Sequence, residues 1–422
     1  MTEIQPGPSK LHIVLLAIIF AVGIFLRVTP HAFSVGATLQ SIAFLHPEPA
    51  FNKIGFDEGL YREYVNALSK DGLSSYPDIV QGYIDVQKGL RGSILPPLRF
   101  LFIFTAYTWH SIFGSEALDA LRQVAAFFSM LTLALATSFA WRIRGPTWAI
   151  AIAALMAVAP TQLHMSQHAL VDGFFTFWAL LVLWLLWENL QAPRDWRWLV
   201  GYIVALGLLV LTKENSFFVW IALVALLTTN RWLQFGTVTR ELVIATFLGP
   251  LLGVVALIFL AGGIDVFVQS YQLSVGKNFQ LRYAILTGDG PWYRYLVDLL
   301  LVSPIILILS LGTVFRLNRT MKPELFMSIF IAASYLLMCN VKYGMNLRYA
   351  NMWDMPLRFL AFSQILAMAS LAKKYRAAVV ASAVVLLAAI EFRQYIVLAV
   401  HYPLHELITH DLLQALQILK SL

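Results

Sequence analysis

Long apolar runs separated by short polar segments recur along the whole chain. The first, residues 11–28, is long enough to cross a hydrocarbon core of about 30 Å as a helix. Further runs of this kind fall at residues 121–140, 147–163, 172–187, 198–212, 216–229, 241–261, 294–311, 325–340, 355–371 and 377–390. The pattern predicts an all-α, polytopic membrane protein with about eleven transmembrane helices, organised as one domain over residues 1–422.

Two polar segments are long enough to form structured loops on one side of the membrane. The first covers residues 29–114 and the second residues 262–293. Within the first, residues 57–68 place apolar and aromatic side chains at helical spacing, which predicts a juxtamembrane helix lying in the interface. Asp57 and Glu58 stand at the N-terminal end of that helix. We therefore expect an adjacent pair of carboxylates just outside the first apolar span.

The two ends of the chain are expected to lie against the membrane. Lys10 precedes the first span and no small-residue cleavage site follows it, so the first helix is interpreted as an uncleaved anchor. Residues 391–422 contain three histidines and end in LLQALQILKSL, which predicts an amphipathic tail at the outer surface. No separate soluble domain is expected.

The segment at residues 95–114 decides on which side of the membrane every later loop lies. Its apolar run is short and ends in threonine, tryptophan and histidine side chains. If it does not cross, five short loops with twelve Lys or Arg residues face the cytoplasm, whereas the opposite short loops hold only Lys213. Basic residues are enriched in cytoplasmic loops. We therefore predict that residues 95–114 do not cross and that Asp57 faces the outer side.

Composition supports a membrane protein and excludes several other classes. Of the 422 residues, 59% are hydrophobic and 13% are charged, compared with about 25% charged residues in soluble domains. The net charge of +7 is distributed over short loops, so we expect no nucleic-acid partner. The single cysteine, Cys339, excludes an internal disulfide framework.

Unusual polar motifs gather on the predicted outer side. Polar groups at membrane depth are costly and tend to mark function. The motifs are Asp57 with Glu58, and residues 161–172, 212–216, 275–295 and 340–349. Because all of them are predicted on one side, the pattern favours a single outward-facing cavity.

The acidic and histidine motifs also have structural interpretations. Asp57 and Glu58 would suit a helix N-terminus without any chemistry. His164 and His168 share a helical face, with Asp172 one turn further on, which is compatible with a metal site. Because the spacing specifies no third ligand, interfacial polarity is the preferred interpretation. We therefore predict no metal or other cofactor.

The basic residues of these motifs allow two interpretations as well. Lys213 is the only base in the short outer loops, and a lone cation there suits a phosphate. The structural alternative is that it pairs with the adjacent Glu214. Arg348, Arg282 and Arg294 would equally serve as anchors at the headgroup level. Because all of these basic residues are predicted on the same side of the membrane, we favour the interpretation that they share one functional site.

The order of these motifs resembles that of the C-type (GT-C) glycosyltransferases related to protein O-mannosyltransferases and aminoarabinose transferases. The resemblance extends from about residue 12 to residue 371. Two positions depart from the family pattern, because Leu95 stands where His or Lys is usual and Gln167 where Arg is usual. The residues that carry the resemblance are Arg27, Asp57, Glu58, Tyr61, Pro96, Pro97, Leu98, Ser166, Ala169, Asp172, Lys213, Arg348 and Tyr349.

The resemblance implies an inverting transfer of a sugar from a polyprenyl-phosphate donor at the outer face of the cytoplasmic membrane. The implied acceptor is a hydroxyl or amine on a lipid, a glycan or a protein, and membrane lipids surround the enzyme. An acceptor hydroxyl has a pKa far above 7, so a carboxylate must take its proton. The leaving phosphate needs cations placed beforehand.

These requirements give each candidate residue an expected role. Asp57 is the predicted base, and Glu58 is expected to orient it or to bind the acceptor. Repulsion between two neighbouring acids is expected to raise the pKa of one of them. The cations predicted to hold the donor phosphate are Lys213, Arg348, Arg282 and Arg294. The side chains predicted to position the substrates are Tyr61, Arg62, Tyr349, His164, His168 and Asp172.

A secondary transporter is the alternative function, since it would also have a polar cavity between many helices. Transporters carry their ionisable residues near the midplane on broken helices, often in repeated halves. In this chain the motifs fall at helix ends and the two halves do not repeat. The pattern therefore favours the transferase.

Overall fold

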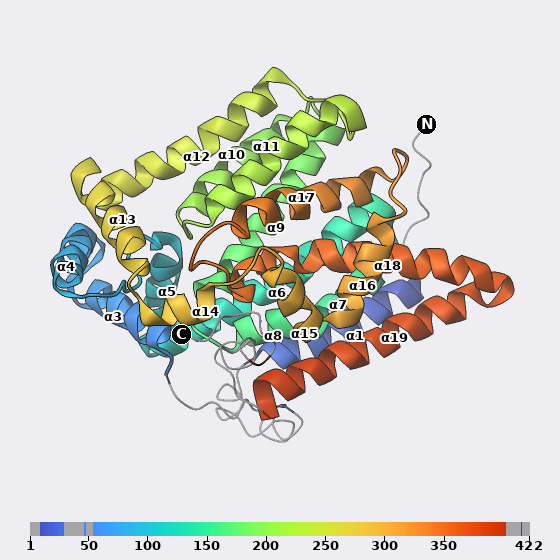
Figure 1. Ribbon diagram of the computed structural model, residues 1–422, viewed down its shortest axis with the longest axis horizontal. Helices are drawn as coiled ribbons and strands as arrows, with labels where there is room; N and C mark the ends of the chain where they lie inside the picture. The colour runs from blue at the N-terminus through green and yellow to red at the C-terminus, as the bar shows by residue number, and fades with distance from the viewer. Residues whose placement is uncertain (1–8, 29–45, 48–53, 402–414, 416–422) are drawn as a thin grey trace.

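Figure 1 shows a bundle of helices, and within residues 9–28, 46–47, 54–401 and 415, which the computed structural model describes, every regular element is helical. The predicted all-α class is confirmed. The first half contains α1 (Lys10–Arg27), α3 (Phe56–Asp71), η2 (Leu73–Ser75), α4 (Tyr76–Gly89), α5 (Phe100–Phe113), α6 (Ala117–Arg144), α7 (Pro146–Ala157), α8 (Pro160–Ser166), α9 (Val171–Gln191) and α10 (Trp196–Val210). The second half contains α11 (Ser216–Leu233), α12 (Arg240–Leu260), α13 (Ile264–Asn278), α14 (Arg282–Gly288), α15 (Arg294–Val302), α16 (Pro304–Val314), α17 (Lys322–Met338), η3 (Leu347–Trp353), α18 (Asp354–Ala369), η4 (Ser370–Tyr375), α19 (Arg376–Tyr395) and η5 (Ile396–His401).

The expected count of eleven spans is not confirmed. Among the described residues, six helical stretches are long and apolar enough to cross a membrane, or seven if the bent pair α7 and α8 forms one span. This count treats residues 347–401 as one stretch, whereas the sequence pattern divides them. The apolar helices α5, α10 and α16 are shorter. The chain is nevertheless a multi-pass integral membrane protein.

Proline breaks two of the predicted spans. Pro160 opens α8, which is bent by 58° from α7. Pro304 opens α16 directly after α15. Proline lacks a backbone N–H and its ring clashes with the preceding turn, so a helix ends before it. The runs at residues 147–163 and 294–311 therefore each contain two helices rather than one.

The bundle has two polar ends. At one end, on the left in Figure 1, the helices α3, α4, α5 and α13 lie together. At the far end of α6, Arg142 pairs with Glu188 at 3.0 Å and Arg144 pairs with Glu324 at 2.7 Å. The end that carries α3 corresponds to the predicted outer side. Which side of the membrane it faces stays a prediction.

Both ends of α5 pack at the end of the bundle that carries α3. Near its start, the Leu101 N–H donates to Leu211 O at 2.9 Å. Near its end, Trp109 Nε1 donates to Gln123 Oε1, in the first turns of α6, at 2.7 Å. A helix of 14 residues is only about 21 Å long, shorter than a hydrocarbon core of about 30 Å. This is the geometry expected of a segment that does not cross.

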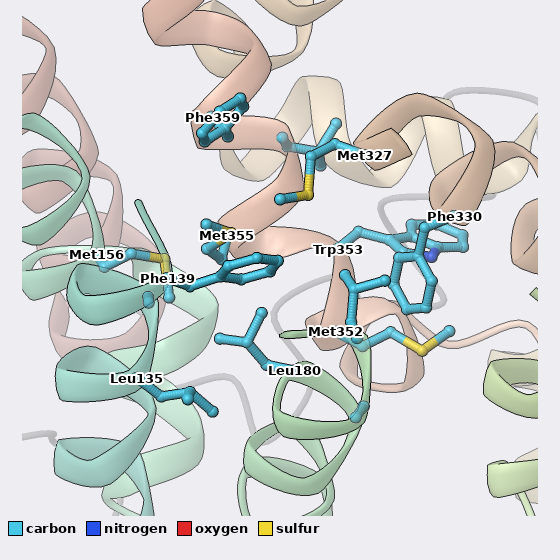
Figure 2. Close-up of a cluster of buried hydrophobic side chains, with 14 of the residues drawn as sticks. Leu135, Phe139, Met156, Leu180, Met327, Phe330, Met352, Trp353, Met355 and Phe359 are labelled. Carbon is cyan, nitrogen blue, oxygen red and sulfur yellow. The ribbon is translucent and has the colours of Figure 1, made fainter. Parts of the chain in front are cut away.

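A buried apolar core packs against η3 and holds it in place. Figure 2 shows Phe139 and Leu180 directed toward Met355, with Trp353 beside the neighbouring helix α17. The indole N–H of Trp353 donates to Ser334 Oγ at 2.8 Å. Protein interiors are close-packed and transmit displacements. The position of η3 therefore depends on α6, α9, α17 and α18 together.

Glycine allows α10 and α12 to approach closely. A Cβ atom on Gly253 would lie 2.7 Å from Gly207 O, and one on Gly249 would lie 2.6 Å from Leu206 Cβ. Small residues permit this kind of close contact between membrane helices. The packing fixes the C-terminal end of α10 and the turn that follows it.

Parts of the predicted loops and tail lie outside the described residues. In the first outer loop these are residues 29–45 and 48–53, and at the C-terminus they are residues 402–414 and 416–422. The amphipathic tail was predicted to begin at residue 391, but residues 391–395 continue α19. The assignment of residues 262–293 to an outer loop stays a prediction, and α13 and α14 lie within that segment.

Candidate active site

Asp57 and Glu58 lie in the first turn of α3 but enter different surroundings. The helix begins after Gly55, whose N–H donates to Glu58 Oε2 at 2.8 Å. A carboxylate that accepts from the residue before the helix in this way fixes the helix start. Successive side chains of a helix are about 100° apart around its axis. Because Glu58 is fixed on one face, Asp57 points in another direction.

Glu58 is fully buried and surrounded by hydrogen-bond donors. Its Oε1 accepts from Ala169 N–H at 2.8 Å and lies 3.7 Å from His168 Nδ1, while Arg122 donates to the two oxygens at 3.3 and 3.4 Å. Burial opposes ionisation, but the interactions with His168, Arg122 and Ala169 outweigh it and hold the pKa of Glu58 well below its usual range. The expected rise of a pKa by repulsion is therefore wrong for Glu58.

Glu58→Gln is expected to destabilise the protein by about 3 kcal/mol, because it leaves the Arg122 guanidinium without its buried counter-charge. Thermal unfolding of the purified protein in one detergent measures the effect. Glu63→Gln is the matched control, since Glu63 lies on the same helix, is exposed and, among the described residues, forms an ion pair with Arg62. An unchanged unfolding temperature combined with lost turnover would show that Glu58 acts chemically.

Asp57 is linked through Arg348 to a series of charged side chains from three other segments. Arg348, in η3, donates from Nη1 to Asp57 Oδ2 at 3.0 Å, and its Nε lies 3.7 Å from Asp172 Oδ2. Lys213, in the turn between α10 and α11, donates to Asp172 Oδ1 at 2.5 Å. Asp172 thus contacts both cations. We refer to Asp57, Asp172, Lys213 and Arg348 as the charged cluster.

The two carboxylates of the charged cluster lie at helix N-termini. Asp57 is in the first turn of α3, and Asp172 is the second residue of α9. The N-terminal end of a helix carries partial positive charge, which stabilises an anionic side chain. Both carboxylates therefore lie at the positive end of a helix backbone dipole.

The charged cluster is largely closed to solvent. The exposed fraction of the side chain is 16% for Asp57, compared with 4% for Asp172, 1% for Lys213 and 7% for Arg348. The ammonium of Lys213 lies 3.8 Å from the centre of the Tyr349 ring, a cation–π contact. Asp57 is therefore the member of the cluster that is most accessible to another molecule.

Lys213 lies outside the spanning segments, and its proton is weakly held. Burial lowers the pKa of Lys213 to about 8. The attraction of Asp172 opposes this shift, whereas the positive charges of Arg99 and Arg348 add to it. Lys213 is thus mainly cationic at pH 7 and loses its charge in mildly alkaline solution.

Arg99 is a candidate residue that the sequence reasoning missed. It is 7% exposed, donates to Tyr61 Oη at 2.7 Å and binds both oxygens of Glu214 at 2.5 and 3.2 Å. Glu214 therefore pairs with Arg99 and not with its neighbour Lys213, which leaves Lys213 to Asp172. The sequence feature that could have identified Arg99 is its position directly after the Pro-Pro-Leu motif.

Tyrosine hydroxyls from the first-loop helices hold the extended segment that leads to Arg99. Tyr64 donates to Leu95 O at 2.6 Å, and Tyr76 donates to Pro97 O. Each bond joins α3 or α4 to the backbone of this segment. Leu95 thus contributes a backbone carbonyl at a position where the resembling family usually has His or Lys.

His164 and His168 lie close together, and His168 approaches Glu58. Both are buried, and their ring centres are 4.6 Å apart. Within the part of the chain that the structure describes, no three His, Cys, Asp or Glu side chains are grouped as a metal site requires. His168 thus adjoins Glu58, and His164 packs against His168.

Three arginines of the predicted site, two of them predicted to bind phosphate and Arg62 predicted to position substrate, are not joined to the charged cluster by any contact in the described structure. Arg62 is directed to Glu63 at 3.2 Å. Arg294 is buried, and its Nε lies 3.6 Å from Asp298 Oδ2. Arg282 is exposed at the start of α14. The structure brings Lys213 and Arg348 together, but it does not bring these three residues to them.

Two residues of the sequence motifs satisfy backbone carbonyls at helix ends. Arg27, the last residue of α1, is fully buried, and it donates to Met156 O at 2.8 Å and Ala157 O at 2.9 Å. Gln167 donates to Leu26 O at 2.8 Å. The last carbonyls of a helix lack partners within it. Arg27 thus supports the end of α7, and Gln167 supports the end of α1.

Residues 96–275 match the model of the dolichyl-phosphate-mannose-protein mannosyltransferase family. No curated protein sequence matches the chain significantly. ArnT from Cupriavidus metallidurans bound to undecaprenyl phosphate has a similar structure, with a TM-score of 0.52 and 16% identity over 92% of this chain and 75% of that chain. The archaeal oligosaccharyltransferase AglB from Archaeoglobus fulgidus, in complex with an inhibitory peptide and a dolichol-phosphate, has a TM-score of 0.56 and 15% identity over 92% of this chain and 55% of that chain.

These similarities confirm the resemblance to GT-C glycosyltransferases. The chain has the GT-C fold, and the segment similar to mannosyltransferases includes Asp172 and Lys213. Apo ArnT has a TM-score of 0.51, and this chain covers 63% of its length. The chain is thus shorter than the solved structures that it resembles.

Proposed function

We propose that the protein is an inverting glycosyltransferase that moves a sugar from a polyprenyl-phosphate donor to an acceptor hydroxyl or amine. We place the reaction at the outer face of the cytoplasmic membrane. The charged cluster is the observation that carries the proposal, because Asp57 lies beside Arg348, which shares Asp172 with Lys213. A base and two cations beside one another are what such a transfer needs.

Asp57 is the general base in this proposal. Glu58 already accepts hydrogen bonds at both oxygens from Gly55, Ala169 and Arg122. Asp57 is more accessible, and Arg348 contacts its Oδ2. The acceptor oxygen or nitrogen attacks the anomeric carbon as Asp57 Oδ1 takes its proton. The bond from that carbon to the phosphate oxygen breaks in the same step, which inverts the configuration.

Lys213 and Arg348 stabilise the charge that develops on the departing phosphate. Charges interact more strongly in a buried site than in water. A donor phosphate also competes with Asp57 for Arg348, since the guanidinium contacts Asp57 at 3.0 Å before the donor arrives. Donor binding therefore releases Asp57 to act on the acceptor. Asp172 keeps the two cations in place during this exchange.

The solved relatives support a lipid-linked donor. The ArnT structure holds undecaprenyl phosphate, and the AglB structure holds a dolichol-phosphate. The basic loops at the opposite end of the bundle support an outward-facing site. A donor of this kind brings an activated sugar to a membrane face without a soluble nucleotide sugar.

Binding and turnover with defined lipids test the proposal. The purified protein in lipid nanodiscs is expected to bind undecaprenyl phosphate and to release it from undecaprenyl-phosphate-linked sugars when an acceptor is present. A panel of donors with lipid, glycan and peptide acceptors identifies the sugar and the acceptor. Failure to bind undecaprenyl phosphate and to use any donor would contradict the proposal. Movement of intact donor across a proteoliposome membrane would favour the transporter instead.

A further inference from the structure

A second group of charged side chains lies inside the bundle, apart from the charged cluster. Arg358, in α18, donates to Asp354 Oδ1 at 2.9 Å and to Glu391 Oε2, in α19, at 2.5 Å. Ser303, between α15 and α16, donates to the same Glu391 oxygen at 2.8 Å. The exposed fraction of each of these residues is 5% or less. Ionised groups inside a membrane bundle are costly and tend to have a function.

Gln162 connects this group to η3. Its side-chain amide, in α8, donates to Asp354 Oδ2 at 2.8 Å and also to the Asn351 side-chain oxygen. Asn351 lies in η3 three residues after Arg348, and Asp354 directly follows η3. We refer to these residues as the buried network, which consists of Gln162, Ser303, Asp354, Arg358 and Glu391.

The segment η3 needs such support because of its geometry. It is a 3-10 helix of seven residues. Helices of this kind have poor hydrogen-bond geometry, and runs longer than three or four residues are uncommon. Its orientation must then be set by side-chain contacts at its ends. Asn346 caps its start by accepting from Arg348 N–H at 3.0 Å, and the buried network holds its end.

We propose that the buried network positions Arg348 toward the donor phosphate and that Glu391 supplies the negative charge on which this depends. The proposal rests on the proposed function, since it concerns the donor site. The network joins α8, the end of η3, α18, α19 and the break between α15 and α16. Glu391 is thus a positioning residue, which acts through Arg358 and Asp354 and does not touch the substrate.

The charges of the buried network explain how Glu391 affects the position of η3. Arg358 is held between Asp354 and Glu391, and Arg27 lies close enough to Asp354 to interact with it electrostatically. Both hydrogen bonds to Glu391 use Oε2, whereas its Oε1 has no hydrogen-bond partner among the described residues. Without the Glu391 charge, Arg358 would interact more strongly with Asp354. Asp354 would then move away from Gln162 and displace the end of η3.

Glu391→Gln tests this inference, because it keeps the size of the side chain and removes its charge. We expect the Kd for undecaprenyl phosphate and the KM for the donor to rise by about 5- to 10-fold, with the KM for the acceptor unchanged. Thr313→Val is the matched control. Thr313 donates to Leu360 O of α18 at 2.7 Å, so the control removes a buried hydrogen bond to the same helix outside the network.

A second, milder variant tests the same role if Glu391→Gln does not fold. Ser303→Ala removes one hydrogen bond to Glu391 and is expected to raise the same Kd by about twofold. Equal Kd values in the unsubstituted protein and all three variants would overturn the positioning role. Equal rises in donor and acceptor KM would also overturn it and indicate a general structural effect. If the unsubstituted protein does not bind undecaprenyl phosphate, the proposed function itself is contradicted.

Discussion

Replacement of Asp57 by asparagine is expected to reduce sugar transfer by about 10²- to 10⁴-fold, the usual contribution of a general base. Asparagine keeps the shape of the side chain and an oxygen that can accept from Arg348, but it does not take the acceptor's proton at neutral pH. The fold and the binding of undecaprenyl phosphate should remain. Single-turnover transfer and equilibrium donor binding, measured on the same preparation, separate the two effects.

The control for Asp57→Asn is Asp71→Asn. Asp71 is exposed at the far end of the same helix, so its substitution should leave transfer unchanged. A purified Asp57→Asn variant with normal turnover would disprove the role of Asp57. Loss of donor binding in parallel with turnover would instead show that Asp57 mainly positions Arg348.

Lys213→Gln is expected to lower kcat/KM for the donor by about 10²- to 10³-fold, as loss of one preorganised donor to a developing anion does. Glutamine still donates to Asp172, which limits structural damage, but it brings no positive charge to the phosphate. The KM for the acceptor should change little. Steady-state kinetics with each substrate varied in turn measure both quantities, and Lys70→Gln on the exposed face of α3 is the control.

The dependence of kcat/KM on pH gives an independent test of Lys213. Because the pKa of Lys213 is lowered to about 8, the residue is cationic below that pH and neutral above it. We therefore expect kcat/KM for the donor to fall as the pH rises through about 8, since this quantity reports the free enzyme. Lys213→Arg keeps its charge at every accessible pH and should remove the fall. A fall that persists in Lys213→Arg would assign it to another group.

The fold class was accessible from the sequence because hydropathy over a helical length is a local property. Each predicted span contains a helix in the structure, and the all-α class is confirmed. The number of membrane spans could not be predicted from hydropathy alone. Pro160 and Pro304 divide two apolar runs into pairs of helices, and a hydropathy pattern does not show where an apolar run bends.

The candidate active site could be predicted only in part from the sequence. The acidic pair, Asp172, Lys213 and Arg348 were all named from the sequence, because charged residues stand out in an apolar chain. The different contacts of the two acids were not predicted, since Glu58 contacts Ala169 N–H, 111 residues away in sequence, and Asp57 contacts Arg348, 291 residues away. The roles of Arg282 and Arg294 stay predictions without a structural contact to the charged cluster.

The sequence by itself determined that this chain is a helical membrane protein with an acidic pair and several cations on one predicted side. Those properties depend on the composition and order of short segments. Only the tertiary structure decided that Asp57 contacts Arg348 while Glu58 binds the backbone just before α9. The same holds for the pairing of Arg99 with Glu214 and for the link from Glu391 to η3. The physical reason is that these contacts join residues from different helices, and their partners are set by the packing of the whole bundle.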